Sequence, residues 1–340
     1  MPAVTRPRSA PRSRVGRGII GAPTPSAPTV LVWSRDATRR QALEAAVRAL
    51  GGQALTAIES PDPAQPASLV VVDAGSVPRE AIAGWRRPTS LVPWLVVAPR
   101  GQAAAEPCGA TGCMGGDEDP ARPDGVLARL IAAVREVPEI GRYLLRLDDE
   151  EVALAFHPRP GANATLVRFL LHDLSMRHPG RRLPNTEVQL ALHEALANAL
   201  EHGNLGITYE EKTAAMETSG GVRALVDQRL CDERLAARMA HVRVIYAADE
   251  VAYMVRDEGS GFDARCRTHE PMAAATALHG RGLKLIQHVM DDVRWNPAGT
   301  EITMGKRLDG PGVLGEDDDE DDEDDRDLDD DRVPGARGRA

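Results

Sequence analysis

The chain has 340 residues, so it is long enough for two domains with separate cores, and its formal net charge is −10 at pH 7. Residues 316–332 hold fourteen acidic residues and two arginines, which leaves about +2 for the rest of the chain. This near-neutral remainder gives no indication of nucleic-acid binding, and no apolar run approaches the ~18 residues that a membrane helix needs.

Both ends of the chain are poor in apolar residues. Residues 1–28 are rich in arginine and proline, and residues 309–340 contain the acidic run, so both segments are predicted to be disordered. The acidic tail is interpreted as a solubilising segment, with a competitor for basic partner surfaces or an autoinhibitor as alternatives. The four cysteines follow neither a zinc-site spacing nor a disulfide framework, and no convincing signal peptide precedes them. We therefore expect a cytoplasmic protein with reduced thiols.

Residues 29–137 alternate short apolar runs with helical patterns. A doubly wound parallel sheet, with helices on both faces, is typical of this alternation. Ligands of such sheets bind at the carboxyl ends of the strands, and Asp73 ends the strongest one, LVVVD. The predicted strands are 29–33, 54–58, 69–73 and 94–97, and the predicted helices are 39–50 and 126–134.

This first region resembles the receiver domain of bacterial response regulators, which implies a flavodoxin-like fold and Asp73 as a possible phospho-acceptor. Three family features are missing. Ser34-Arg35-Asp36 stands where receivers carry an acidic pair for Mg²⁺, Ala98-Pro99 replaces a Ser or Thr, and Gly115-Gly116 lies near the expected Lys-Pro. Without these groups, phosphoryl transfer to Asp73 lacks electrostatic support. We interpret residues 29–137 as a pseudo-receiver that serves for docking or dimerisation.

Residues 142–308 read as a second domain. We expect no chemical role for residues 205–240, which are rich in charge and alanine, and we interpret His172 as an ordinary helix residue. The predicted strands are 150–156, 241–247, 250–256, 293–295 and 301–306, and the predicted helices are 164–176, 188–204, one or two within 205–240, and 283–289.

The stretch VQLALHEALANALEHGN (188–204) carries the first candidate site residues. On a helix, Glu194 and Asn198 lie one turn apart, at the edge of the buried face, where a cleft can open. Gly203 is suited to a left-handed helix cap. Four residues form the narrow apolar stripe of this helix: Val188, Leu192, Ala195 and Ala199.

Two later stretches combine glycines with polar groups. Asp257 continues the buried side of its strand and leads into Gly259-Ser260-Gly261, and a buried carboxylate is costly unless a partner donates hydrogen bonds to it. Gly280-Arg281-Gly282 precedes an apolar helix, and Gly299-Thr300 precedes the last strand. Glycine turns at a helix start expose backbone amides, so this pattern indicates phosphate and base binding.

These motifs resemble, in this order, those of the GHKL ATP-binding superfamily. The resemblance covers about residues 142–308 and implies an α+β two-layer sandwich that binds ATP and Mg²⁺. It implies that Asp257 accepts a hydrogen bond from the adenine amino group, that Thr300 supports the same base, and that Gly259 and Gly261 allow close approach to base and ribose.

The same resemblance assigns the phosphate end of the ligand. Asn198 would hold Mg²⁺ through its amide oxygen, and Glu194 would orient or deprotonate the attacking hydroxyl. The amides at Gly280 and Gly282 would face phosphate, with Arg281 as a candidate phosphate contact and Leu283 as a further ATP-binding residue.

The stretches EALANALEHGN, VRDEGSGFD, GRGLKLIQHVMDDV and GTEITMGKRL are similar to the anti-sigma-factor serine/threonine kinases of bacteria. This resemblance implies phosphorylation of an anti-sigma antagonist of the STAS type, and sequestration of a sigma factor when the antagonist is absent. A homodimer is compatible with it, whereas nucleic-acid and membrane partners are not expected. Two alternatives stay open: a nucleotide-gated binding module without phosphoryl transfer, and a response-regulator-like protein controlled through Asp73.

Overall fold

The computed structural model describes residues 27–61, 66–85, 92–103, 110–159, 161–261 and 281–308. Disorder was predicted for residues 1–28 and 309–340, and these segments lie almost wholly outside the described residues. None of the described helices combines the length and apolar content needed to cross a bilayer.

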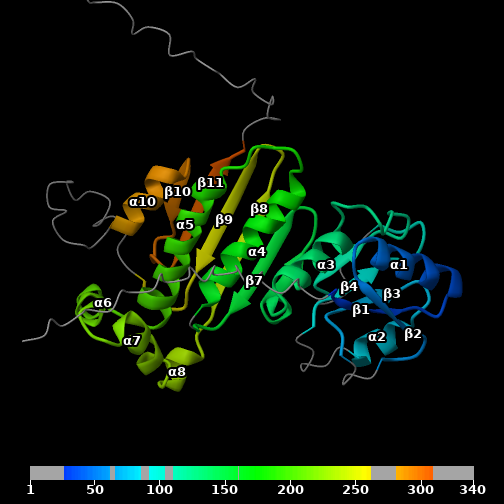
Figure 1. Cartoon of the computed structure of the whole chain (residues 1–340), viewed down its shortest axis with the longest axis horizontal. Helices are drawn as coiled ribbons and strands as arrows, with labels where there is room; N and C mark the ends of the chain where they lie inside the picture. Colours follow the sequence, from blue (N-terminus) through cyan, green and yellow to red (C-terminus); the bar gives the residue numbers. More distant parts are fainter. Residues whose placement is uncertain are drawn as a thin grey trace, which may run out of the picture.

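The first domain is built on a five-stranded parallel sheet with the order β2-β1-β3-β4-β5 (Figure 1). This order is that of flavodoxin-like doubly wound folds, so the predicted fold class of the first domain is confirmed. All five residues of β3 are buried, because helices cover both faces of the sheet. The strands are β1 (Thr29–Trp33), β2 (Gln53–Ala57), β3 (Leu69–Asp73), β4 (Trp94–Val97) and β5 (Gly112–Met114).

Three helices accompany this sheet: α1 (Ala37–Ala49), α2 (Arg79–Trp85) and α3 (Val126–Glu136). Our sequence interpretation missed α2 and β5, because seven and three residues are too short to show a clear period. In α3, every residue from 126 to 134 is buried. A helix that is buried on all sides needs neighbours on all sides, and α3 packs between the first sheet and α4 of the second domain.

The second domain is a two-layer sandwich. Its six-stranded antiparallel sheet has the order β10-β11-β9-β8-β7-β6, and α4 (Ala162–Arg177), α5 (Asn185–Ala197) and α10 (Arg281–Val289) lie over one face (Figure 1). The predicted α+β sandwich is therefore confirmed. The strands are β6 (Leu144–Leu147), β7 (Glu151–Phe156), β8 (Ala240–Tyr246), β9 (Glu250–Arg256), β10 (Asp292–Trp295) and β11 (Glu301–Arg307).

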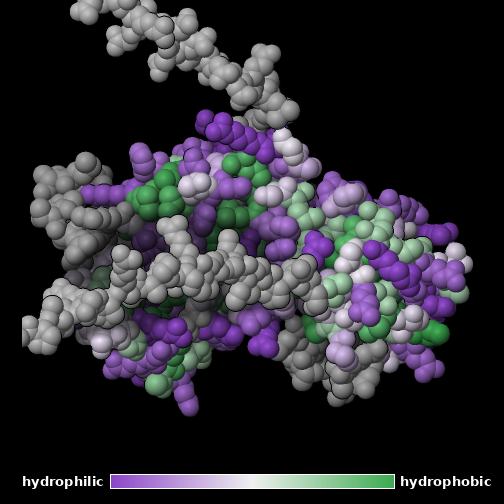
Figure 2. All heavy atoms as spheres, viewed as in Figure 1, coloured by the Kyte–Doolittle hydropathy of each residue, from purple (hydrophilic) through white to green (hydrophobic). Residues whose placement is uncertain are grey.

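A helical insertion separates α5 from β8. The helix α5 continues into a π-helical turn, η2 (Asn198–Asn204), and the chain then forms α6 (Tyr209–Met216), α7 (Gly221–Arg229) and α8 (Glu233–Ala236). One or two helices were predicted here, and three are present. None of the residues of α6, α7 and α8 is buried, and hydrophilic side chains cover much of this part of the surface (Figure 2).

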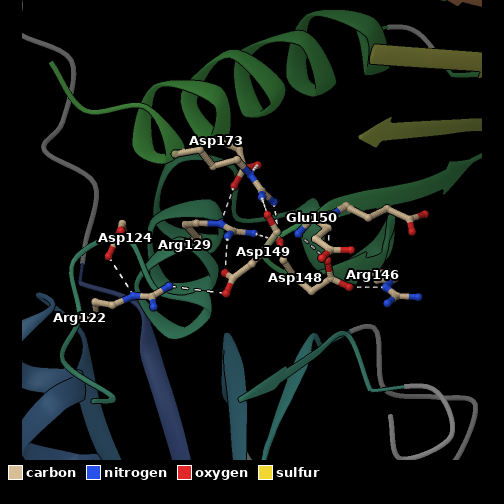
Figure 3. Close-up of polar contacts among 10 residues, drawn as sticks. Arg122, Asp124, Arg129, Arg146, Asp148, Asp149, Glu150 and Asp173 are labelled. Atoms are coloured by element: carbon tan, nitrogen blue, oxygen red, sulfur yellow. Dashed lines mark hydrogen bonds and ion pairs between the residues drawn. The ribbon is translucent and has the colours of Figure 1, made fainter. Parts of the chain in front are cut away.

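The two domains share one hydrophobic core and a buried ion-pair network (Figure 3). Arg129 of α3 and Asp173 of α4 are each 2% exposed, and Arg129 Nε lies 3.1 Å from Asp173 Oδ1. Arg177 Nε donates to the other oxygen of Asp173 at 2.7 Å, and Arg129 also pairs with Asp149. The backbone joins the domains as well, since the Leu147 amide donates to the Thr111 carbonyl at 2.7 Å. The first domain is thus packed onto the second through α3.

We predict that Asp173→Asn destabilises the whole chain, because it removes the charge that neutralises two buried guanidinium groups. Breaking a buried ion pair from one side costs about 3–5 kcal/mol. Urea unfolding measures the change, with Arg122→Ala as the control, since the Arg122–Asp124 pair of the same region is about half exposed. An Asp173→Asn variant that loses no more stability than the control contradicts the prediction.

Candidate functional site

A cavity of about 430 Å³ opens at one end of the second domain, where η2, the start of α6 and the loops after β9 and before β11 meet. Several residues from the sequence motifs line it, although these motifs are up to about 100 positions apart in the chain. Among its lining residues are Asn198, His202, Gly203, Tyr209, Val255, Asp257, Gly261, Leu283, Trp295, Thr300 and Ile302.

The helix α5 presents Asn198 to this cavity. The predicted stripe is confirmed, because its four residues, Val188, Leu192, Ala195 and Ala199, are at most 5% exposed. Asn198 lies off this stripe, is partly exposed, and lines the cavity. The helix therefore holds the carboxamide at the border between core and solvent, as its spacing predicts.

Glu194 lies one turn earlier but does not line the cavity. Its carboxylate packs against the backbone of Gly282, where a Cβ would overlap Glu194 Oε1. Gly282 is in the first turn of α10, and a carboxylate at a helix N-terminus interacts favourably with the helix dipole. Glu194 therefore joins α5 to the start of α10.

Asp257 follows β9 directly, and its backbone continues the sheet through a hydrogen bond from its amide to the Thr300 carbonyl (3.0 Å). Its Oδ1 accepts the Gly259 amide at 2.8 Å. Burial raises the pKa of the Asp257 carboxyl above its ordinary value of 3.8, although the Gly259 amide lowers it. The half-buried carboxylate therefore faces the cavity with only part of its hydrogen-bonding capacity used by described residues.

Gly203 and Gly259 allow η2 to touch the end of β9. A Cβ at Gly203 would overlap the carboxyl carbon of Asp257, and a Cβ at Gly259 would overlap the carbonyl of Gly203. The prediction that Gly203 forms a left-handed cap is wrong, because Gly203 lies within η2, and the positive φ (+59°) occurs at Gly206. The reason for a glycine here is close backbone approach.

Gly261 and Thr300 meet beside the end of β9, and both line the cavity. Gly261 has φ +70°, and a Cβ there would overlap the Ala298 carbonyl. Asn296 fixes the loop before β11, since its Oδ1 accepts the Thr300 amide (2.9 Å) and its Nδ2 donates to Thr300 Oγ1 (3.0 Å). The structure thus brings Asp257, Gly259, Gly261 and Thr300 together.

The second glycine motif is only partly described. Gly280 lies outside the described residues, and Arg281 begins α10 without a described side chain. Leu283 lines the cavity, and Gly282 contacts Glu194. The predicted phosphate contacts at Gly280 and Arg281 stay predictions.

Sequence reasoning missed part of the cavity wall. Residues 206–210 line it, although we expected no chemical role for residues 205–240, and Trp295 lines it from the end of β10. Apolar residues that line a pocket show the same period as core residues, so no sequence signal separated them. His202 also lines the cavity, and its Nδ1 contacts the Ile207 carbonyl at 2.6 Å.

Comparison with known families fits this geometry. Residues 156–306 match the family model described as histidine kinase-like ATPase domain. The second domain is a histidine kinase-like ATPase domain. The chain is also similar to the solution structure of a response regulator protein from Burkholderia multivorans, with 27% identity, a TM-score of 0.25, and coverage of 32% of this chain and 94% of that one. No curated protein matches the chain.

An ATPase domain implies ATP binding, and the cavity suits such a ligand. Pockets of a few hundred cubic ångströms that combine apolar walls with a few polar groups are typical of small-molecule sites. Mg²⁺ keeps several waters and takes further ligands from phosphates, so it needs only one or two protein oxygens. The carboxamide of Asn198 at the cavity edge fits that requirement.

Asp73 lies far from this cavity in the fold, at the carboxyl end of β3. Its side chain has no exposed surface. Oδ2 accepts hydrogen bonds from Ser34 Oγ (2.8 Å) and Ser76 Oγ (2.7 Å), and Oδ1 accepts the Gly75 amide (3.1 Å). Arg39 Nε lies 3.4 Å from Oδ1. Protein groups therefore surround both carboxylate oxygens.

This geometry does not favour Asp73 as a phospho-acceptor. An acceptor carboxylate needs access to a phosphodonor and to Mg²⁺, whereas Asp73 is enclosed and neutralised by Arg39. The nearby Asp36 is used as the N-cap of α1, where its side chain accepts the Arg39 amide at 3.0 Å. The pseudo-receiver interpretation agrees with both observations.

We predict that Gly203→Ala weakens ATP binding at least tenfold, because the added methyl group displaces the Asp257 carboxylate or separates η2 from β9. Overpacking of this kind typically costs about 1–3 kcal/mol of stability as well. Isothermal titration calorimetry measures the affinity. Gly161→Ala is the control: its Cβ meets open space but its φ is +84°, so it should lose stability and keep ATP affinity. Equal ATP affinities in the two variants would count against the proposed role of Gly203.

Proposed function

We propose that the protein is an ATP-dependent serine/threonine protein kinase of the anti-sigma-factor type. Its substrate is an anti-sigma antagonist of the STAS type, and it sequesters a sigma factor when that antagonist is absent. The observation that carries the proposal is the packing of Gly203 and Gly259 on Asp257, which puts a half-buried carboxylate and Thr300 at the end of one cavity and Asn198 at its edge.

The base end of the nucleotide is assigned to Asp257. A half-buried carboxylate is stabilised by a hydrogen-bond donor, and the exocyclic amino group of adenine is such a donor. Thr300 supports the same base, directly or through water. Gly261 leaves room for base and ribose, because its backbone packs against the Ala298 carbonyl with no side chain between them.

The phosphate end is assigned to Asn198 and the start of α10. Asn198 holds Mg²⁺ through its amide oxygen, and the triphosphate and water supply the other ligands. The N-terminus of α10 attracts phosphate through free amides, with Gly280, Arg281 and Gly282 as the proposed contacts. Glu194, next to Gly282, orients or deprotonates the attacking hydroxyl.

A hydroxyl substrate is favoured over an internal histidine. His172 lies in α4, and its Nε2 is buried without a hydrogen-bond partner among the described residues. Its neighbour Asp173 is fixed between Arg129 and Arg177. A phospho-accepting histidine must present a ring nitrogen to the γ-phosphate, whereas Nε2 of His172 is buried.

A second candidate function is a nucleotide-gated binding module without phosphoryl transfer. The packing of Glu194 against Gly282 favours it, because this carboxylate then joins two helices and does not face the cavity. In such a module, ATP changes the position of α10 relative to α5, and the partner-binding surface changes with it.

Glu194→Gln distinguishes the two functions. If Glu194 is the catalytic base, we expect the variant to bind ATP with nearly normal affinity and to transfer phosphate at least a hundredfold more slowly. Incubation with labelled Mg-ATP and candidate antagonists measures the transfer as acid-stable phosphoserine or phosphothreonine. His193→Gln on the same helix turn is the control. Acid-labile label, or label on no antagonist, contradicts the kinase proposal, and unchanged biological activity of Glu194→Gln supports the binding module.

ATP affinity should decrease as the pH falls through the raised pKa of Asp257, at a higher pH than an exposed aspartate would show. The ionised carboxylate is the stronger acceptor for the adenine amino group, so protonation weakens binding. Asp257 affects the stability of the fold with the opposite sign. Because its pKa is raised in the folded state, the folded state takes up the proton more readily than the unfolded state, and lowering the pH removes the free-energy cost of burying the charged carboxylate. Calorimetric titrations across pH measure the affinity. Asp257→Asn should bind more weakly and lose this pH dependence, and an identical profile in both proteins contradicts the assignment.

A further inference from the structure

The insertion between η2 and β8 contributes a wall of the nucleotide cavity. Five consecutive residues, 206–210, line the cavity, although they belong to none of the motifs assigned to base, metal or phosphate. Residues 206–208 connect η2 to α6, and Tyr209 and Glu210 are the first residues of α6, the first helix of the insertion. A segment that the kinase motifs do not include thus forms part of the site.

This segment is held in place from both ends. The Leu205 and Ile207 amides donate to carbonyls of η2, at 3.0 and 2.9 Å, and the Ile207 side chain is buried. Thr208 caps α6 in a reciprocal pair of hydrogen bonds with Glu211. Lys212 Nζ lies 2.7 Å from Glu201 Oε2, which joins the next turn of α6 to η2. Contacts within the protein therefore hold this wall in place.

Two aromatic rings meet at this wall. The centroids of His202 and Tyr209 are 4.2 Å apart, and the ring planes are inclined by 37°. Because a carbonyl only accepts hydrogen bonds, the contact of His202 Nδ1 with the Ile207 carbonyl fixes the proton on Nδ1. Burial lowers the pKa of His202, so the imidazole is neutral at pH 7. The pair is an uncharged aromatic surface.

The position of this pair indicates which part of a nucleotide it contacts. His202 lies one helical turn after Asn198, and the next residue, Gly203, touches the Asp257 carboxylate. If the proposed function holds, Asn198 marks the phosphate end and Asp257 marks the base end. The pair then flanks the space between them, where the nucleoside lies.

We propose that the insertion supplies Tyr209 as a positioning residue, and that the His202–Tyr209 pair forms the wall against which the nucleoside of the bound nucleotide packs. Aromatic side chains stack favourably on the faces of heterocyclic bases, and this stacking needs no hydrogen bonds to the edge of the base. The inference rests on the proposed function only in that the ligand is an adenine nucleotide, and it does not require phosphoryl transfer.

Calorimetry of the full chain with ATP and with ADP tests the proposal. Tyr209→Ala should weaken the binding of both nucleotides by the same factor, about ten- to a hundredfold, because they share the nucleoside. Tyr209→Phe keeps the ring and should bind as the wild type does. Met216→Ala is the control, since Met216 lies on the same helix, is 60% exposed and does not line the cavity.

Tyr209→Leu keeps an apolar contact with η2 and replaces Tyr209→Ala in the experiment if that variant does not fold. We expect it to lose ATP and ADP affinity by the same factor as Tyr209→Ala. If Tyr209→Ala binds ATP and ADP with the same affinities as Met216→Ala, the proposal is overturned. A loss of affinity in Tyr209→Ala that is confined to ATP also overturns it, because that result would place Tyr209 at the γ-phosphate. Failure of the wild type to bind either nucleotide would overturn the proposed function as well. Wild-type binding without phosphoryl transfer leaves this inference standing and contradicts only the kinase assignment.

Discussion

The direct contact between the backbone of η2 and the carboxyl group of Asp257 is the constraint on which the site depends. The helical layer and the sheet normally meet through side chains. At Gly203 and Gly259 no side chains intervene, so the end of α5 reaches the end of β9. This contact joins two motifs that are more than fifty residues apart and leaves the carboxylate half-buried, with a raised pKa, beside the cavity.

A second constraint acts at the junction of the domains. Helix α3 belongs to the first domain, yet its residues are part of one core with α4 and the second sheet. Burying Arg129 and Asp173 costs desolvation free energy, which their mutual contact and the added partners Arg177 and Asp149 offset. A buried pair fixes one geometry, because any other docking would leave a charge unpaired. Asp73 is neutralised by Arg39 within the first domain, so the charged groups of that domain that are buried here all have partners inside the protein.

Glu194 connects the structural and the chemical interpretations. As a carboxylate against the first turn of α10, it stabilises the helix that closes one side of the cavity. A γ-phosphate at the same helix N-terminus would compete for the same amides and would move the carboxylate toward a substrate hydroxyl. A structural role of Glu194 without nucleotide is therefore compatible with the catalytic role proposed for it when nucleotide is bound.

The sequence by itself determined the doubly wound class of the first domain, the amphipathic face of α5 and most strands, because periods of 2 and 3.6 residues report directly which side of an element is buried. The sandwich class of the second domain came from the resemblance of its motifs to a known superfamily. The resemblance to the GHKL superfamily also pointed to Asn198, Asp257, Gly261, Leu283 and Thr300, all of which line the cavity. Only the tertiary structure decided that Gly203 is needed for contact with Asp257, that Glu194 turns toward Gly282, and that residues 206–210 line the cavity. The physical reason is the same in each case: these roles are set by the distance between segments far apart in the chain, and local periodicity carries no information about that distance.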